Sequence, residues 1–118
     1  MSKRIYLSLP YSGNEEESFK AANKFTAELM NRGYIVFSPI SMSHPVATQC
    51  ELPGGWEFWR KLDTAFIEWC EELHVLCLDG WENSTGVTAE IGIAEGLGKT
   101  IVYWNMDGTI LNVTDSKK

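Results

Sequence analysis

The segment from Leu73 to Ile101 constrains the fold of this chain more than any other. A short apolar run at 74–78 is typical of a buried strand, and a polar turn containing glycine follows at 79–86. Val87 to Leu97 then carries apolar side chains at helical spacing, and residues 100–104 have the pattern of a second strand. A strand–loop–helix–strand unit connects two parallel strands, so this segment predicts a parallel sheet.

The rest of the chain continues this alternation of strands and helices. Strands are predicted at 4–9 and 34–37, helices at 15–31 and 56–72, and one more short strand is a candidate at 110–113. The pattern predicts a single α/β domain over residues 1–118. We expect a three-layer sandwich around a mainly parallel, Rossmann- or flavodoxin-like sheet.

Residues 38–55 interrupt the alternation with a long segment that contains several serines and prolines. We interpret this segment as a long loop at the same edge of the sheet as the loops that follow the strands. A loop of this length in a compact domain is usually functional or partly disordered.

Charge and cysteine content argue against several classes of protein. The net charge of −6 and the isoelectric point near 4.8 disfavour non-specific binding to nucleic acid or to an anionic membrane surface. No apolar run is long enough for a membrane helix or a signal peptide. The cysteines form no CxxC pair, and no Cys/His/Asp spacing indicates a metal site. We therefore expect a cytoplasmic protein with reduced thiols that needs no metal or other cofactor.

Glu90 is the first candidate for a catalytic residue. In open parallel sheets, ligands bind beyond the carboxyl ends of the strands. Glu90 lies one turn into a helix that follows such a strand, and Gly86 would allow a ligand to approach the backbone closely. The alternative interpretation is a solvated glutamate on the helix surface.

Asp63 is the second candidate, in the helix predicted at 56–72. It lies beside the apolar stripe of that helix and not opposite it. The alternative is a carboxylate at the boundary of the core that pairs with Arg60 or Lys61.

Further candidates lie near the expected carboxyl edge of the sheet. Ser84 either caps the helix that carries Glu90 or binds an anion together with free amides, and the two roles are compatible. An aromatic face there can stack on a planar base, although packing over the end of the sheet is an equal alternative. The candidates for substrate binding besides Ser84 are Tyr6, Pro10, Tyr11, His44, Trp81 and Gly86.

Four stretches together resemble the nucleoside 2-deoxyribosyltransferase superfamily, and more closely a branch of short proteins, many of them phage-borne. They are IYLSLPYSG, GYIVFSPISMSHP, LDTAFIEWCEELHVLCLDGW and NSTGVTAEIGIAEGLGKTI, within residues 4–104. The most specific piece is the pattern S-x-G-x-x-x-E-x-G-x-A, formed by Ser84, Gly86, Glu90, Gly92 and Ala94.

The resemblance implies a Rossmann-like fold and an enzyme that acts on a nucleoside or nucleotide. By matching position, Glu90 is the nucleophile, and Asp63 binds the sugar or assists proton transfer. Homodimers or larger oligomers, in which a neighbouring subunit completes the pocket, are also implied. Carboxylates suit this chemistry, because cleavage of an N-glycosidic bond builds positive charge at C1′ that a carboxylate can stabilise or trap as an ester.

Two departures from the family pattern bear on the substrate. Transferases of the family carry an Asp where this chain has Ser84, and a Ser is closer to the branch that hydrolyses deoxynucleoside 5′-monophosphates. That branch binds the phosphate with an Arg in the first loop, where this chain has Ser12. We expect cleavage of a (deoxy)nucleoside or its 5′-monophosphate, with hydrolysis preferred to transfer of the sugar to a second base. The alternative is a catalytically silent nucleotide-binding or sensing module on the same fold.

Overall fold

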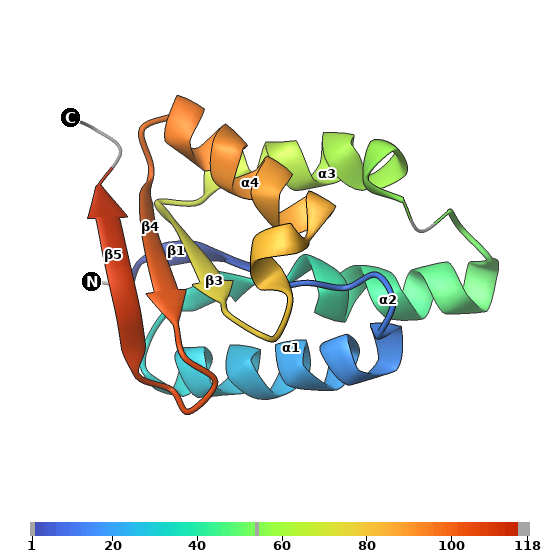
Figure 1. Ribbon diagram of the computed structural model, residues 1–118, viewed down its shortest axis with the longest axis horizontal. Helices are drawn as coiled ribbons and strands as arrows, with labels where there is room; N and C mark the ends of the chain where they lie inside the picture. The colour runs from blue at the N-terminus through green and yellow to red at the C-terminus, as the bar shows by residue number, and fades with distance from the viewer. Residues whose placement is uncertain (1, 54, 116–118) are drawn as a thin grey trace.

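The computed structural model describes residues 2–53 and 55–115, which surround one central sheet. Within these residues the sheet has five strands in the order β2-β1-β3-β4-β5 (Figure 1). The strands are β1 (Arg4–Ser8), β2 (Ile35–Phe37), β3 (Glu72–Leu76), β4 (Thr100–Trp104) and β5 (Ile110–Asp115). The helices are α1 (Glu15–Asn31), α2 (Pro39–Cys50), α3 (Trp56–Trp69), α4 (Thr85–Gly96) and the short 3₁₀ helix η1 (Trp81–Asn83). Neighbouring strands are parallel except for β5, which runs antiparallel to β4.

Alternation along the central strands divides the core into two halves. Ile5 and Leu7 of β1 pack with α1 on one face of the sheet. Tyr6 points to the other face and packs with side chains of α3 and α4. Successive strand residues point to opposite faces, so both faces of β1 are buried. Helices cover both faces of the sheet in Figure 1, and the predicted three-layer α/β sandwich is confirmed.

The strand order defines where a ligand can bind. β1 and β3 are neighbours in the sheet, and the helices that follow them, α1 and α4, cover opposite faces. Ligands of open α/β sheets bind at such a point, in the crevice beyond the carboxyl ends of the two strands. The loops after β1 and β3 therefore meet where the candidate residues are expected.

Residues 38–55 are the main correction to the predicted fold, because most of them form α2 and not a loop. Ser38 caps this helix by accepting a hydrogen bond from the backbone N–H of Ser41 at 3.4 Å. Pro39 follows at the start of the helix, where a missing N–H costs nothing. Pro45 lies in the interior of α2, where a proline is normally unfavourable because it has no N–H group to donate. Packing of α2 against α1 outweighs this local preference.

The other elements lie where the sequence predicts them, with shifted ends. α4 begins at Thr85, two residues before its predicted start, because Ser84 caps it. α3 ends at Trp69, and Glu72 already belongs to β3, so the predicted end of that helix was too late. The candidate strand at 110–113 is confirmed as part of β5.

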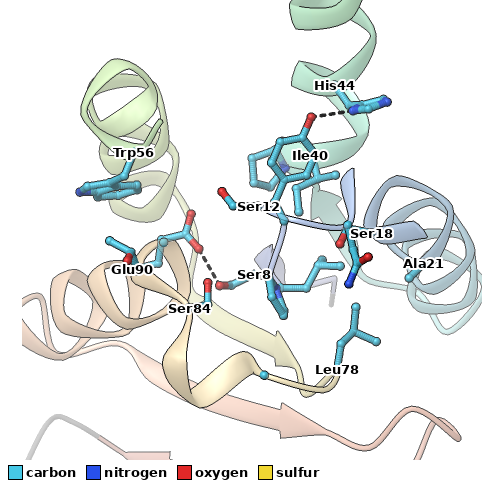
Figure 2. Close-up of a pocket in the computed structure, with 18 of the residues that line it drawn as sticks. Ser8, Ser12, Ser18, Ala21, Ile40, His44, Trp56, Leu78, Ser84 and Glu90 are labelled. Carbon is cyan, nitrogen blue, oxygen red and sulfur yellow. Dashed lines mark hydrogen bonds between the residues drawn. The ribbon is translucent and has the colours of Figure 1, made fainter. Parts of the chain in front are cut away.

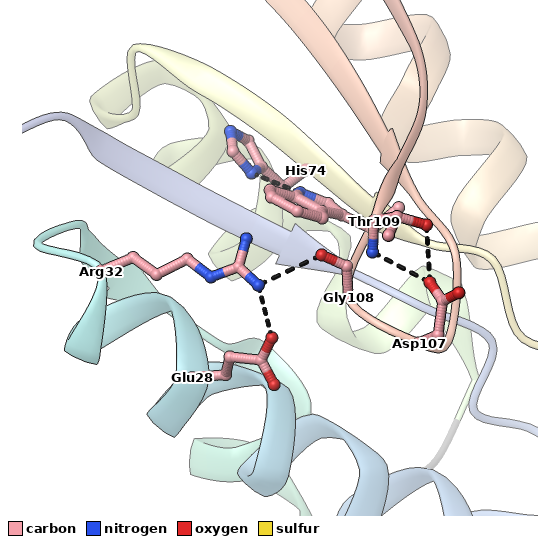
Figure 3. A network of polar contacts seen from close by, with 7 residues as sticks. Glu28, Arg32, His74, Asp107, Gly108 and Thr109 are labelled. Atoms are coloured by element: carbon pink, nitrogen blue, oxygen red, sulfur yellow. Dashed lines mark hydrogen bonds and ion pairs between the residues drawn. The ribbon is translucent and has the colours of Figure 1, made fainter.

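A polar network joins α1 to the β4–β5 turn (Figure 3). Arg32 donates hydrogen bonds to Glu28 at 2.7 Å and to the carbonyl oxygen of Gly108 at 3.1 Å. Its guanidinium also lies over the ring of Trp104, 5.0 Å from the ring centroid. Trp104 in turn donates from Nε1 to Nδ1 of His74 at 2.9 Å. His74 is thus part of the structural core of the sheet, as its position in a strand predicts.

Candidate active site

A cavity of about 820 Å³ lies at the carboxyl ends of β1 and β3. Its volume falls within the range of roughly 300–1,000 Å³ that is usual for sites of small ligands. Its wall is formed by the loop after β1, α2, the first half of α3, the turn after β3 and the start of α4. Figure 2 shows Glu90 and Trp56 on one side of this cavity, and His44 and Ile40 on the other. The cavity therefore occupies the position that the strand order favours for a ligand.

Glu90 lines the cavity with a carboxylate that is only 6% exposed. Tyr6 donates a hydrogen bond to Oε2 at 2.5 Å, and Ser8 donates one to Oε1 at 2.6 Å. Both donors belong to β1 and, being two residues apart, share one face of the sheet. Ser8 was not among the sequence candidates, although the alternation of β1 places it beside Tyr6. The structure excludes the alternative of a solvated surface glutamate.

Asp63 reaches the same cluster from α3. Its side chain is 7% exposed and lines the cavity, and its Oδ1 is buried without a hydrogen-bond partner among the described residues. The carboxyl is close enough to Tyr6 and Glu90 to raise the pKa of both. Arg60, its alternative partner, lies 3.6 Å from Glu57 instead. A buried oxygen without a protein partner at a cavity wall is available to a hydroxyl group of a ligand.

Burial raises the pKa of both carboxyls in this cluster, to about 8 for Glu90 and to about 6 for Asp63. The charge of Asp63 raises the pKa of Glu90 further, whereas the hydrogen bonds from Ser8 and Tyr6 lower it. Two carboxyls that interact this strongly titrate as a pair. Near neutral pH the pair therefore holds one proton, and it supplies both an ionised carboxylate and a proton donor.

The start of α4 forms a second polar part of the wall. Ser84 caps the helix by accepting a hydrogen bond from the backbone N–H of Val87 at 3.3 Å. Thr85 and Gly86 follow in the wall, and the first N–H groups of a helix have no partner within it. A Cβ added to Gly86 would meet no atom within 4 Å, so a ligand has room beside the backbone. This end of α4 can accept an anionic group.

The loop after β1 and α2 form the opposite wall. Pro10 and Tyr11 both line the cavity, and the Tyr11 hydroxyl lies 2.6 Å from Nδ1 of His44. His44 is buried and stacks on Phe19 of α1 with ring centroids 4.5 Å apart. Its Nε2 lies 2.9 Å from Glu16. His44, which we expected in a loop, is thus held by a helix and by three side chains.

The structure corrects the prediction that Trp81 binds the substrate, because Trp81 does not lie in the wall of this cavity. It packs on Tyr103 with ring centroids 5.5 Å apart and lines a separate pocket beside α4. The tryptophans of the cavity are Trp56 and Trp59 of α3, which were not among the sequence candidates for substrate binding. Their helical spacing from Asp63 could have predicted this role, since it places all three side chains on one face of the helix.

The charged side chains that line the cavity are acidic. Four carboxyl groups line it, from Glu17, Asp63, Asp79 and Glu90, and the described lining includes no Lys or Arg. A phosphate group in this cavity would therefore depend on hydroxyl and amide donors. In the part of the chain that the structure describes, no group of three or more His, Cys, Asp or Glu side chains is arranged to hold a metal ion.

Comparison with protein families establishes the relationship of the chain. The model of a family described as "Domain of unknown function (DUF1937)" matches residues 3–106. The chain belongs to the DUF1937 family. No curated protein matches this DUF1937 chain.

A solved structure shares the fold of this DUF1937 chain. It is the CMP N-glycosidase BcmB of Clostridium botulinum, which is 21% identical in sequence. The match covers 87% of the DUF1937 chain and 71% of that protein, with a TM-score of 0.58. The nucleoside 2-deoxyribosyltransferase-like fold, expected from the resemblance, is thereby confirmed. The activity must be inferred from the site itself.

Proposed function

We propose that this protein cleaves the N-glycosidic bond of a (deoxy)nucleoside or its 5′-monophosphate, with Glu90 as the nucleophile. One observation carries the proposal: the buried Glu90 carboxylate, hydrogen-bonded by Tyr6 and Ser8, lies beside Asp63 in a cavity of ligand size. The shared fold with a CMP N-glycosidase supports chemistry of the N-glycosidase type.

The higher pKa of Glu90 places the shared proton mainly on Glu90, so the reacting form is the one in which this proton has moved to Asp63. In the first step, an oxygen of ionised Glu90 attacks C1′ of the sugar. The bond from C1′ to the base nitrogen breaks, and its electron pair leaves with the base. The base takes up the proton that Asp63 holds, so a neutral base departs and a glycosyl ester remains on Glu90. The hydrogen bonds from Tyr6 and Ser8 orient the attacking carboxylate. The charge of Asp63 raises the pKa of Glu90, so the two carboxyls lie near each other, and a short separation of the carboxyls is typical of glycosidases that form a covalent intermediate.

In the second step, water attacks C1′ of the ester while ionised Asp63 accepts a proton from that water. The ester bond breaks, the free sugar leaves, and the Glu90 carboxylate is restored. The uncharged Ser84 and the exposed Ser12 line the cavity, and polar groups such as these admit water. We therefore propose water as the acceptor, in preference to a second base.

A 5′-phosphate would bind at the start of α4 in this proposal. Ser84 supplies a hydroxyl there, and Thr85 and Gly86 supply N–H groups at the positive end of the helix dipole. Asp63 Oδ1, which has no partner among the described residues, would accept a hydrogen bond from a sugar hydroxyl. The sugar would thus lie between α3 and α4, with C1′ beside Glu90.

The test is to incubate the protein with a panel of deoxynucleosides and their 5′-monophosphates and to measure free base. The wild type and Glu95→Gln, an exposed change on the same helix, should release base, and Glu90→Gln and Glu90→Ala should not. Loss of a nucleophile typically costs several orders of magnitude in rate. Equal base release by the wild type and Glu90→Gln would overturn the proposal. Ligands that raise the melting temperature while no base is released would favour the sensing module instead.

Three further expectations stay predictions. A homodimer or larger oligomer is tested by sedimentation, and the need for no cofactor by activity after treatment with a chelator. The cytoplasmic location is tested by cell fractionation. Among the described residues, no helix has both the length and the apolar character needed to cross a membrane.

A further inference from the structure

A second chain of hydrogen-bonded side chains lies across the cavity from Glu90. Its members are Tyr11, His44 and Glu16, with 2.6 Å between the Tyr11 hydroxyl and His44 Nδ1, and 2.9 Å between His44 Nε2 and Glu16. Figure 2 shows His44 on the side of the cavity opposite Glu90. The proposed reaction assigns no role to these three side chains.

Glu16 determines which nitrogen of His44 carries the hydrogen. An ionised carboxylate only accepts hydrogen bonds, so His44 must donate from Nε2 to Glu16. In the neutral imidazole, Nδ1 then has a lone pair and accepts the hydrogen of the Tyr11 hydroxyl. The only polar hydrogen of Tyr11 is therefore committed to His44. The Tyr11 oxygen can offer the cavity an acceptor and not a donor.

Packing holds this arrangement in place before a ligand arrives. His44 is 5% exposed, with its ring stacked on Phe19, and the ring of Tyr11 meets it edge-on at 78°. Burial and the nearby Glu15 and Glu16 charges raise the pKa of Tyr11, so its hydroxyl stays protonated. Glu16 itself is 72% exposed, and its substitution therefore leaves the core intact.

We propose that Tyr11, positioned by His44 and Glu16, accepts a hydrogen bond from the substrate and selects substrates that carry a donor at that place. The donor is either an exocyclic amino group of the base or a hydroxyl group of the sugar. The inference rests on the proposed function for the identity of the ligand as a nucleoside. A ligand with an oxygen acceptor in place of the donor would set that oxygen against the Tyr11 oxygen, and no hydrogen bond could form between the two acceptors. The affinity would fall about tenfold.

Substitution of Glu16 tests the positioning role without touching the cavity. In Glu16→Lys the new ammonium group only donates, so a hydrogen bond to His44 requires the lone pair on Nε2; the ring hydrogen then moves to Nδ1 and the Tyr11 hydroxyl turns toward the cavity. Tyr11→Phe removes the acceptor altogether. Glu15→Lys is the matched control, because it makes the same change of charge in the same helical turn, at a residue that forms no hydrogen bond with His44.

The readout is the ratio of dissociation constants within pairs of ligands, measured in the Glu90→Gln background to prevent turnover. The base pairs are deoxycytidine with deoxyuridine and deoxyadenosine with deoxyinosine, and the sugar pair is deoxycytidine with its 5′-deoxy analogue. We expect a preference of about tenfold for the donor-bearing ligand in one kind of pair. The Glu15→Lys control should keep this preference, and Glu16→Lys and Tyr11→Phe should lose most of it. The pair that responds identifies the donor as amino group or hydroxyl.

Unchanged preferences in Glu16→Lys and Tyr11→Phe, or no binding of any probe, would overturn the inference. A measurement without ligand tests this inference independently of the proposed function. The ¹⁵N chemical shifts of the two histidines report which ring nitrogen is protonated. His44 should carry its hydrogen on Nε2 in the wild type and on Nδ1 in Glu16→Lys. His74 is an internal reference, because Trp104 donates to its Nδ1 and Glu72 lies 2.9 Å from its Nε2. Base release with His44 protonated on Nδ1 in the wild type would refute this inference alone. The expected tautomer and preferences without base release would refute the proposed function alone.

Discussion

Replacement of Glu90 by glutamine should abolish base release and also stabilise the fold, by an amount that grows with pH. Glu90 is 6% exposed, and burial raises its pKa from 4.5 to about 8. Between these two values the folded protein binds a proton that the unfolded chain does not. Its stability therefore falls as pH rises through this window. Glutamine keeps the shape of the side chain and carries no charge, so it removes this cost.

The magnitude follows from the interval between the two pKa values. Each pH unit in this interval lowers stability by at most about 1.4 kcal/mol, so the cost between pH 5 and pH 8 is at most roughly 4 kcal/mol. The pKa of about 8 already includes the hydrogen bonds from Tyr6 and Ser8, which lower it. Asp63 titrates together with Glu90, so only part of the cost belongs to Glu90, and we expect Glu90→Gln to gain about 2 kcal/mol relative to the wild type over this range.

Urea unfolding of both proteins at pH 5 and pH 8 measures this difference directly. The control is Glu95→Gln on the exposed side of α4, which should stay within about 0.5 kcal/mol of the wild type at both pH values. If Glu90→Gln gains no stability between pH 5 and pH 8, Glu90 does not carry a raised pKa.

Three further predictions concern turnover. Asp63→Asn should lower kcat by about a hundredfold or more, because it removes the proton donor and keeps the shape of the side chain. It should not lower the melting temperature, because burial also raises the pKa of Asp63 and the neutral amide removes a buried charge. A wild-type rate in the variant argues against Asp63 as the donor. The dependence of kcat/KM on pH should be bell-shaped with limbs near 6 and 8, because the pair must hold one proton. Protonation of both carboxyls removes the nucleophile at low pH, and loss of both protons removes the acid at high pH. A flat pH profile across this range contradicts the roles of Glu90 and Asp63 as nucleophile and acid. Ser84→Asp should weaken cleavage of the monophosphate more than cleavage of the nucleoside, because the new carboxylate repels a phosphate. Ser84→Asn is the uncharged control. If Ser84→Asp lowers the cleavage rates of both substrates equally, the phosphate binds elsewhere.

The strands and most of the helices were predictable because their side chains repeat with a clear period. Tyr6 lies between Ile5 and Leu7 in β1, and this alternation places the aromatic ring on the opposite face of the sheet. The carboxyl edge of the sheet followed from the strand–loop–helix–strand unit, which made Glu90 a candidate. Its burial was not predictable, because that depends on the contacts that β1 makes across the sheet.

The wall around His44 was less predictable, because tertiary packing decides it. Pro45 and several serines disfavour a helix locally, and the contact with α1 that stabilises α2 joins distant parts of the sequence. The direction in which the Asp63 side chain points was also ambiguous, since a residue at the border of an apolar stripe can point toward the core or toward solvent. Trp81 follows the same kind of strand as Tyr11 does, and only the packing of its ring on Tyr103 shows that it lies outside the cavity.

The role of Glu90 as a nucleophile is tested most directly by the stereochemistry at C1′. Methanol can replace water as the acceptor, and the configuration of the methyl glycoside formed from a β-nucleoside can be read by NMR. Attack by Glu90 followed by attack of methanol inverts C1′ twice, so we expect a β-methyl glycoside. An α-methyl glycoside would mean a single displacement by the acceptor, and Glu90 would then not form a bond to the sugar.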